Sequence, residues 1–363
     1  MVKKRQSNIE LLRIISMLLI VAHHFSVHGG FKFSESSITI NRLWMQFFQM
    51  GGKIGVNVFV LISGYFLIAS SKLKISKVLK LWFQLFFYSV VIYFIFTFFG
   101  NEVLSIKTLI KSCLPVIYTN WWFASTYFLL YLVSPYLNQL LNSFTKKEYQ
   151  NFLVLLTFLW CIIPTLTHRT IQSNPLIWFI YLYAFAGYIR VYGFFNDLKT
   201  KSCMLVAIFV SILTYLSAVI FDFLGLKMVF FSKNATYFFD MQCVPILIIA
   251  VFLFLGFLRL EIKSIKIINV ISSATFGVYL LHDNSYIRPF LWKALFKNAS
   301  YTYKSSLIPY SIVVVALVYI GCTIIELLRI HVVERKYVLY LNRMSEKLGI
   351  FIDKIQKLIS TRI

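Results

Sequence analysis

The sequence predicts an all-α fold, a polytopic membrane bundle of about ten transmembrane helices with both termini in the cytoplasm. Of its 363 residues, 59% are hydrophobic and 18% aromatic, and only 13% are charged, well below the share of about a quarter in soluble domains. Long apolar segments recur along the whole chain, and each is close to the length that a helix needs to cross a bilayer. Basic residues gather in the connections on one side of these segments, which is typical of the cytoplasmic side.

We expect the following order of elements along the chain. The spanning segments are residues 9–27, 51–69, 78–99, 121–141, 152–167, 175–195, 203–221, 241–258, 267–281 and 308–329. Residues 103–118 are amphipathic and should lie at the outer surface or re-enter the bundle. Residues 1–335 form the predicted transmembrane domain. Residues 336–363 form a cytoplasmic tail, in which apolar residues at helical spacing among basic ones predict an amphipathic helix on anionic lipid.

The charge of the chain limits the classes of partner. The formal net charge is +23. In a soluble protein this excess would suggest nucleic acid, but here the positive-inside rule and anionic membrane lipids account for it. No RNA- or DNA-binding motif accompanies the charge, so no nucleic-acid partner is expected. The five cysteines are scattered without metal-ligand spacing, which argues against a disulfide framework or a cysteine metal centre.

Ionisable residues interrupt the first apolar segment. A charge inside a bilayer is costly, so such residues usually have a function and a partner. Arg13 and His24 are eleven residues apart, about three helical turns, and therefore lie on one face about 16 Å apart along the axis. Glu10 precedes Arg13 by three residues and can pair with it. The alternative is a plain membrane anchor, with Arg13 at one interface and the histidines at the other.

A second group of polar residues lies in the stretch TFGVYLLHDN. Tyr279 and His282 share one helical face, and Asp283 and Asn284 follow directly. His282 and His24 are both expected toward the outer ends of their helices, where a shared site would suit proton transfer near neutral pH. Interfacial histidines without a catalytic role are the alternative.

A metal site built from histidines is a weaker alternative. His24 and His28 have a spacing of four residues, which is compatible with metal binding but common by chance. No supporting ligand residues and no CxxC motif accompany this HxxxH spacing. We therefore expect no metal.

Further candidate binding residues have both a structural and a functional interpretation. Asn57, in the stretch GVNVFVLISGY, can supply an interhelical hydrogen bond or a polar group to a site. Lys77 and Lys80, in the run SKLKISKVLK, either mark the cytoplasmic side or bind the phosphates of a cytosolic cofactor. Trp122 either belongs to the interfacial aromatic belt or stacks on a sugar.

These motifs together resemble the integral-membrane acyltransferases (type 3), which include bacterial polysaccharide O-acetyltransferases and the enterobacterial common antigen O-acetyltransferase. The Arg13–His24 spacing, GVNVFVLISGYFL, WWF and FGVYLLHD carry the resemblance, which covers residues 5–340. It implies a bundle of about ten helices that passes an acyl group, usually acetyl from cytosolic acetyl-CoA, to a hydroxyl of a surface or lipid-linked glycan. By position, the essential histidine and arginine of the family correspond to His24 and Arg13, and its late histidine to His282.

The resemblance also implies the environment and the roles of other residues. Expected partners are acyl-CoA, a glycan or lipid-linked sugar, membrane lipids and glycan-synthesis proteins, in the plasma membrane of a bacterium. His24 acts as a general base or carries the acyl group, and His282, Tyr279 or Asn284 orients the acceptor or stabilises the oxyanion. The chain departs from the family pattern at Asn57, where many members have aspartate. It also departs in its lysine-rich stretch, where many have arginines that bind phosphate through two bonds.

Other function classes predict features that the sequence lacks. A transporter or flippase of a lipid-linked sugar is the main alternative, and it would favour paired discontinuous helices with internal symmetry. A glycan polymerase would favour a large external loop rich in arginine. A receptor would need a ligand-binding domain or a signalling tail.

Overall fold

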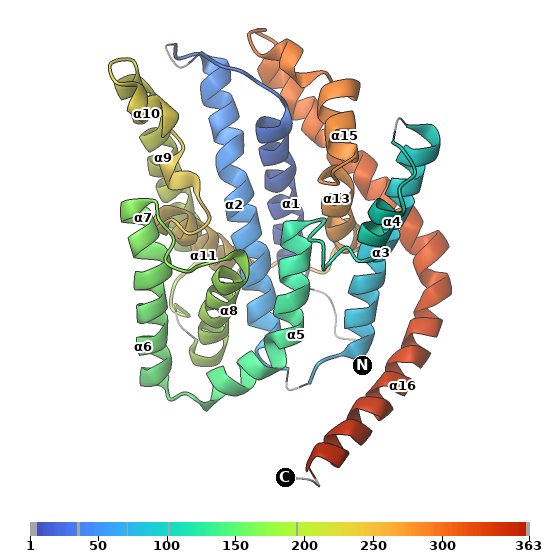
Figure 1. Ribbon diagram of the computed structural model, residues 1–363. Coiled ribbons are helices and arrows are strands. Elements are labelled where there is room, and N and C mark those ends of the chain that lie inside the picture. The colour runs from blue at the N-terminus through green and yellow to red at the C-terminus, as the bar shows by residue number, and fades with distance from the viewer. Residues whose placement is uncertain (1–5, 35–36, 71, 101, 194, 361–363) are drawn as a thin grey trace.

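The computed structural model describes residues 6–34, 37–70, 72–100, 102–193 and 195–360, with side chains as far as residue 350. Every regular element in these ranges is a helix, so the predicted all-α class is confirmed (Figure 1). Helix α1 begins and helix α16 ends toward one end of the bundle, which we call the lower end as it is drawn in Figure 1.

The helices follow one another with short connections. They are α1 (Ser7–His28), α2 (Ile40–Leu67), α3 (Ile75–Phe99), α4 (Ile106–Cys113), α5 (Trp122–Ser143), α6 (Lys146–Thr157), α7 (Ile163–Thr167), α8 (Pro175–Tyr192), α9 (Thr200–Gly225), α10 (Val229–Lys233), α11 (Val244–Leu258), α12 (Lys266–Ser273), α13 (Thr275–His282), α14 (Ile287–Pro289), α15 (Leu307–Arg329) and α16 (Arg335–Ser360). A π-helical turn joins α6 to α7, so that the two form one continuous rod.

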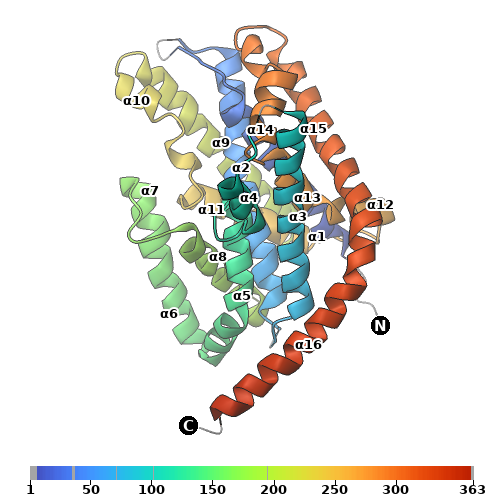
Figure 2. The same cartoon turned by 45° about the vertical axis from the view of Figure 1, so that its right-hand side comes forward.

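Within the described residues, eight helical stretches are long and apolar enough to cross a membrane. Two of the expected segments do not meet both conditions. The segment 267–281 is divided at Ala274 into α12 and α13, which have eight residues each. Helix α5 has 22 residues but is more polar, with Asn138 among its buried side chains. It begins at about the mid-height of the bundle, because α4 and the following turn lead back inward from the top of α3 (Figures 1 and 2).

Helix α2 is the centre of the bundle. It packs along α1 and also contacts α8 and α11. Glycines permit these close approaches. A Cβ atom at Gly64 would lie 2.8 Å from the Cα atom of Tyr183 in α8, and one at Gly55 would lie 2.5 Å from the carbonyl oxygen of Ser16 in α1.

Helix α2 begins at Ile40, eleven residues before the expected start at residue 51. The additional turns carry polar residues that are paired inside the protein. Arg42 Nη2 lies 2.6 Å from Asp222 Oδ1 of α9, and Gln46 Nε2 donates to Asp222 Oδ2 at 2.9 Å. Because these groups satisfy one another, the helix continues upward through a stretch that carries buried polar side chains. The extension places residue 53 well inside the helix.

The lower end is held by a buried network of charges. Arg329 of α15 binds Glu326 through Nε at 2.8 Å and Glu334 through Nη2 at 2.6 Å. Tyr88 of α3 donates to Glu326, and Lys80 of α3 pairs with Glu334. The following helix α16 contacts α3 and extends away from the bundle (Figure 2). It begins one residue before the expected boundary of the tail.

Candidate active site

The site is centred on two histidines that are 258 residues apart in the chain. His24 Nδ1 of α1 lies 2.9 Å from His282 Nε2 at the end of α13, and both side chains are buried. His282 Nδ1 lies 2.6 Å from the carbonyl oxygen of Val278, which only accepts, so Nδ1 carries a proton. In the neutral pair, His282 Nε2 is then the acceptor and His24 Nδ1 the donor. This arrangement leaves the lone pair on His24 Nε2, which makes that atom available as a base.

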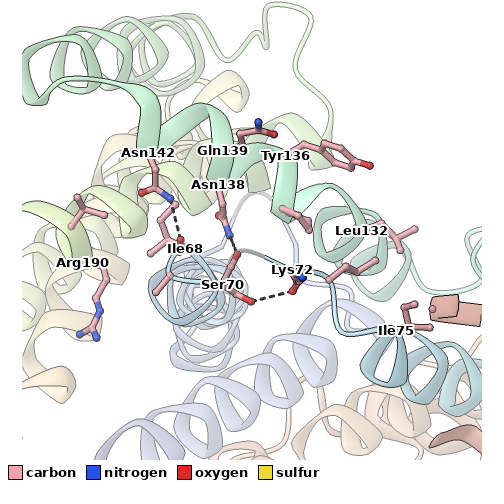
Figure 3. Close-up of a pocket in the computed structure, with 15 residues that line it drawn as sticks. Ile68, Ser70, Lys72, Ile75, Leu132, Tyr136, Asn138, Gln139, Asn142 and Arg190 are labelled. Atoms are coloured by element: carbon pink, nitrogen blue, oxygen red, sulfur yellow. Dashed lines mark hydrogen bonds between the residues drawn. The ribbon is translucent and has the colours of Figure 1, made fainter. Parts of the chain in front are cut away.

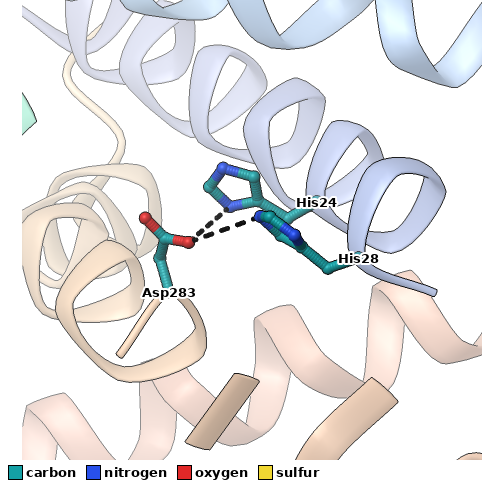
Figure 4. Close-up of side chains that lie close together, drawn as sticks. All are labelled: His24, His28 and Asp283. Carbon is teal, nitrogen blue, oxygen red and sulfur yellow. Dashed lines mark ion pairs between the residues drawn. The ribbon is translucent and has the colours of Figure 1, made fainter. Parts of the chain in front are cut away.

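A carboxylate lies beside this pair (Figure 4). Asp283 Oδ1 is 3.6 Å from His24 Nδ1 and 3.9 Å from His28 Nε2. The same oxygen accepts a hydrogen bond from Arg288 Nη2 at 2.7 Å. Asp283 therefore acts on His24 through its charge, and Arg288 partly balances that charge.

The same three residues could in principle hold a metal. The ligand atoms of His24, His28 and Asp283 all lie within 4.8 Å of one another. However, His24 Nδ1 is already bonded to His282, and the Asp283 oxygen is bonded to the guanidinium of Arg288. A second cation at this carboxylate would be opposed by that guanidinium. The geometry therefore favours proton transfer over metal binding.

A cavity of about 230 Å³ adjoins the histidines, and we call it the upper cavity. Its polar and aromatic lining consists of His23, His24, His28, Lys53, Trp122, Phe123 and Tyr279. Among the described residues, the Tyr279 hydroxyl is buried close to Asp283 and to the backbone of Phe123 but forms no well-aligned hydrogen bond. Burying a hydroxyl without a partner costs free energy, so this group is suited to donate to a ligand.

A second cavity of about 250 Å³ lies below the first, and we call it the lower cavity. Its basic residues are Arg13, Lys77 and Lys80. Arg13 is about one-third exposed and lies 3.8 Å from Glu10, which in turn accepts a hydrogen bond from Ser272 of α12. The lower cavity therefore combines positive charge with access from the lower end.

Phe123 lines both cavities. Its ring centroid lies 5.5 Å from that of Tyr279 on the upper side. On the lower side it lies 6.2 Å from Phe59 and 6.1 Å from Tyr127. The buried Phe123 ring is thus the shared wall of the two cavities.

Among the sequence-predicted residues, Asn57 and Asn284 line neither cavity and form their hydrogen bonds elsewhere. Asn57 donates to the carbonyl oxygen of Met241 at 2.8 Å and accepts from the Trp178 indole at 3.0 Å, so its amide joins α2 to its neighbours. Asn284 accepts from the backbone N–H of Tyr286 at 2.9 Å and shapes the turn before α14. Both side chains are used in packing.

Three residues of the site escaped the sequence reasoning. They are Lys53, Phe123 and Arg288. Lys53 carried a usable signal, since a lysine in the apolar stretch GGKIGV is an intramembrane charge once the helix is extended. Phe123 and Arg288 had no signal of that kind, because an aromatic residue in an aromatic-rich helix and an arginine in a basic loop are common.

A larger cavity of about 1020 Å³ lies at the lower end, between the end of α2, α5 and α8 (Figure 3). Lys72 and Arg190 give it positive charge. Asn138 donates to the carbonyl oxygens of Leu67 and Ser70, at 2.8 and 2.7 Å, and so satisfies the end of α2. The lysine-rich run after α2 is therefore divided, with Lys72 at this large cavity and Lys77 and Lys80 at the lower cavity.

Comparison with known proteins identifies the class. The family profile described as an acyltransferase domain matches residues 6–327, nearly the whole chain. No curated protein and no solved structure shows a significant match. A bundle of membrane-spanning length, with a histidine pair beside a buried cavity, is consistent with acyl transfer inside a membrane. The chain belongs to the acyltransferase 3 family and is a multi-pass membrane acyltransferase.

Proposed function

We propose that the protein transfers acetyl from cytosolic acetyl-CoA to a hydroxyl of a cell-surface or lipid-linked glycan, with His24 as the general base. The observation that carries the proposal is the position of the His24–His282 pair beside the upper cavity, with a basic cavity below it. An acyltransferase needs a donor site and an acceptor site that meet at one base, and the two cavities share a wall.

The lower cavity is the proposed donor site. Its lysines and arginine suit the phosphates of CoA, which favour charge-assisted hydrogen bonds. The lower end also carries basic connections, the start of α1 and the end of α16, and the positive-inside rule supports our proposal that it faces the cytoplasm. Lys80 pairs with Glu334 and Arg13 lies 3.8 Å from Glu10, so Lys77 is the basic residue of this cavity that forms no ion pair among the described residues.

The upper cavity is the proposed acceptor site. Trp122 offers an aromatic face to a sugar, and His24 Nε2 can take the proton of the sugar hydroxyl. The hydroxyl oxygen attacks the thioester carbonyl, the C–S bond breaks, and the proton passes from His24 to the CoA thiolate. The Tyr279 hydroxyl is positioned to donate to the oxyanion of the intermediate. Transfer through an acyl-imidazole on His24 is the alternative sequence of steps.

The proposal places the protein in the plasma membrane of a bacterium, beside the proteins that make the glycan. It is tested with membranes, labelled acetyl-CoA and the surface glycan, by comparing wild type with His24→Ala at matched expression. Loss of a general base should reduce transfer about 10²- to 10⁴-fold. His331→Ala is the matched control, because His331 is exposed and lies at the lower end of α15. Normal transfer by His24→Ala, or no transfer by wild type, would count against the proposal and favour a sugar transporter.

A further inference from the structure

We propose that Lys53 binds an anionic group of the acceptor, a carboxylate or a phosphate, and that the natural acceptor is therefore an acidic sugar. This inference rests on the proposed function and concerns the substrate class of the upper cavity. Lys53 is half-buried in α2 and lines that cavity together with His24 and Trp122.

The position of Lys53 is costly without a ligand. It lies thirteen residues after the first residue of α2, about 20 Å along the helix. An ammonium group at such a depth in a membrane protein usually faces a cavity and has a partner. Among the described residues, Lys53 has the cavity but no charged partner.

Within the described residues, no carboxylate forms an ion pair with Lys53. Asp283 is the carboxylate nearest to the histidines, and its oxygen is bonded to Arg288. The remaining neighbours in the cavity wall are histidines, Tyr279 and apolar side chains. The charge of Lys53 is therefore not balanced by the protein itself.

The indole of Trp122 is the contact that Lys53 does make. Lys53 Nζ lies 5.4 Å from the centroid of this ring. A cation–π contact contributes about 0.5–2 kcal/mol and leaves the ammonium without a negative charge beside it. An anionic ligand would supply that charge.

The same contact indicates which negative charge Lys53 meets. The ammonium lies over the Trp122 ring, which is proposed to contact the sugar, whereas the Tyr279 hydroxyl serves the reacting carbonyl. A sugar held against the Trp122 indole would bring its own carboxylate or phosphate to Lys53. Lys53 thus selects the acceptor rather than driving the chemical step.

The test is a competition assay on wild-type membranes that transfer labelled acetyl to their own glycan. The competitors are methyl glucuronide, glucose 6-phosphate and methyl glucoside, which carry a carboxylate, a phosphate and no charge. We expect one charged competitor to inhibit at a concentration about 10- to 100-fold lower than methyl glucoside, as charge-assisted hydrogen bonds typically allow. The more potent of the two identifies the anion.

The variants are Lys53→Met, which keeps the length and removes the charge, and Lys53→Arg, which keeps the charge. The preference for the charged competitor should disappear in Lys53→Met and persist in Lys53→Arg, while inhibition by methyl glucoside stays unchanged. Equal inhibition by all competitors in wild type, or a preference that survives in Lys53→Met, would overturn the inference. A wild type that transfers no acetyl would instead overturn the proposed function and this inference with it.

Discussion

Replacing Asp283 with asparagine should slow acyl transfer without weakening substrate binding. Asp283 Oδ1 lies 3.6 Å from His24 Nδ1. At an effective dielectric constant of about 20, a unit charge at this distance stabilises an imidazolium by roughly 4.6 kcal/mol. Arg288 is bonded to the same oxygen and offsets much of this energy. If about a quarter to a half of this stabilisation remains in wild type, Asp283→Asn loses about 1–2 kcal/mol of it, which is roughly a 5- to 30-fold lower kcat.

The expected pattern follows from when the charge appears. His24 becomes positively charged only after it takes the hydroxyl proton, so Asp283 stabilises the transition state more than the bound substrates. The assay is the rate of labelled acetyl transfer at saturating acetyl-CoA, together with KM for the acceptor. Asp197→Asn is the matched control, because Asp197 is exposed in the connection before α9. A kcat within twofold of wild type, or a change confined to KM, would refute this role for Asp283.

Three further predictions follow from the walls and charges of the bundle. Phe123→Ala should join the two cavities, so that acetyl-CoA is hydrolysed without acceptor and butyryl-CoA becomes a better donor. Phe123→Leu is the control and should behave like wild type. Unchanged hydrolysis in Phe123→Ala would contradict the role of Phe123 as the shared wall. Asp222→Ala should leave Arg42 buried without its partner and destabilise the protein by about 3–5 kcal/mol, so an unchanged melting temperature in detergent would contradict this ion pair. A chelator should leave acyl transfer unchanged, because His24 Nδ1 is hydrogen-bonded to His282. Loss of activity with the chelator, followed by recovery when zinc is added, would indicate a metal site.

The sequence was sufficient to predict which residues share a face of one helix, because helical periodicity determines this. The eleven-residue spacing of Arg13 and His24 placed both on one face of α1, and the periodicity of α13 turned Tyr279 and His282 toward one side. The 2.9 Å contact between His24 Nδ1 and His282 Nε2 then joins these two helices. The function class followed from the same motifs.

The sequence was insufficient where polar residues are satisfied by distant partners. The first turns of α2 carry the polar residues Arg42 and Gln46, and their partner Asp222 is about 180 residues away. An expected helix start at residue 51 puts Lys53 near a helix end, where a lysine is common, so the sequence alone does not single it out. Asn57 resembles a site residue in the sequence because its hydrogen bonds to Met241 and Trp178, which occupy its amide, come from distant parts of the chain.

The ring of Phe123 also has a consequence for the cell's energy supply. A continuous water-filled passage through the bundle would let ions run down the membrane potential, and each elementary charge that crosses 100 mV dissipates about 2.3 kcal/mol. A buried aromatic ring between the two cavities would keep the passage dry while an acyl group moves past it. Under the proposed function, the enzyme passes its acyl group across a charged membrane while its core remains an electrical insulator.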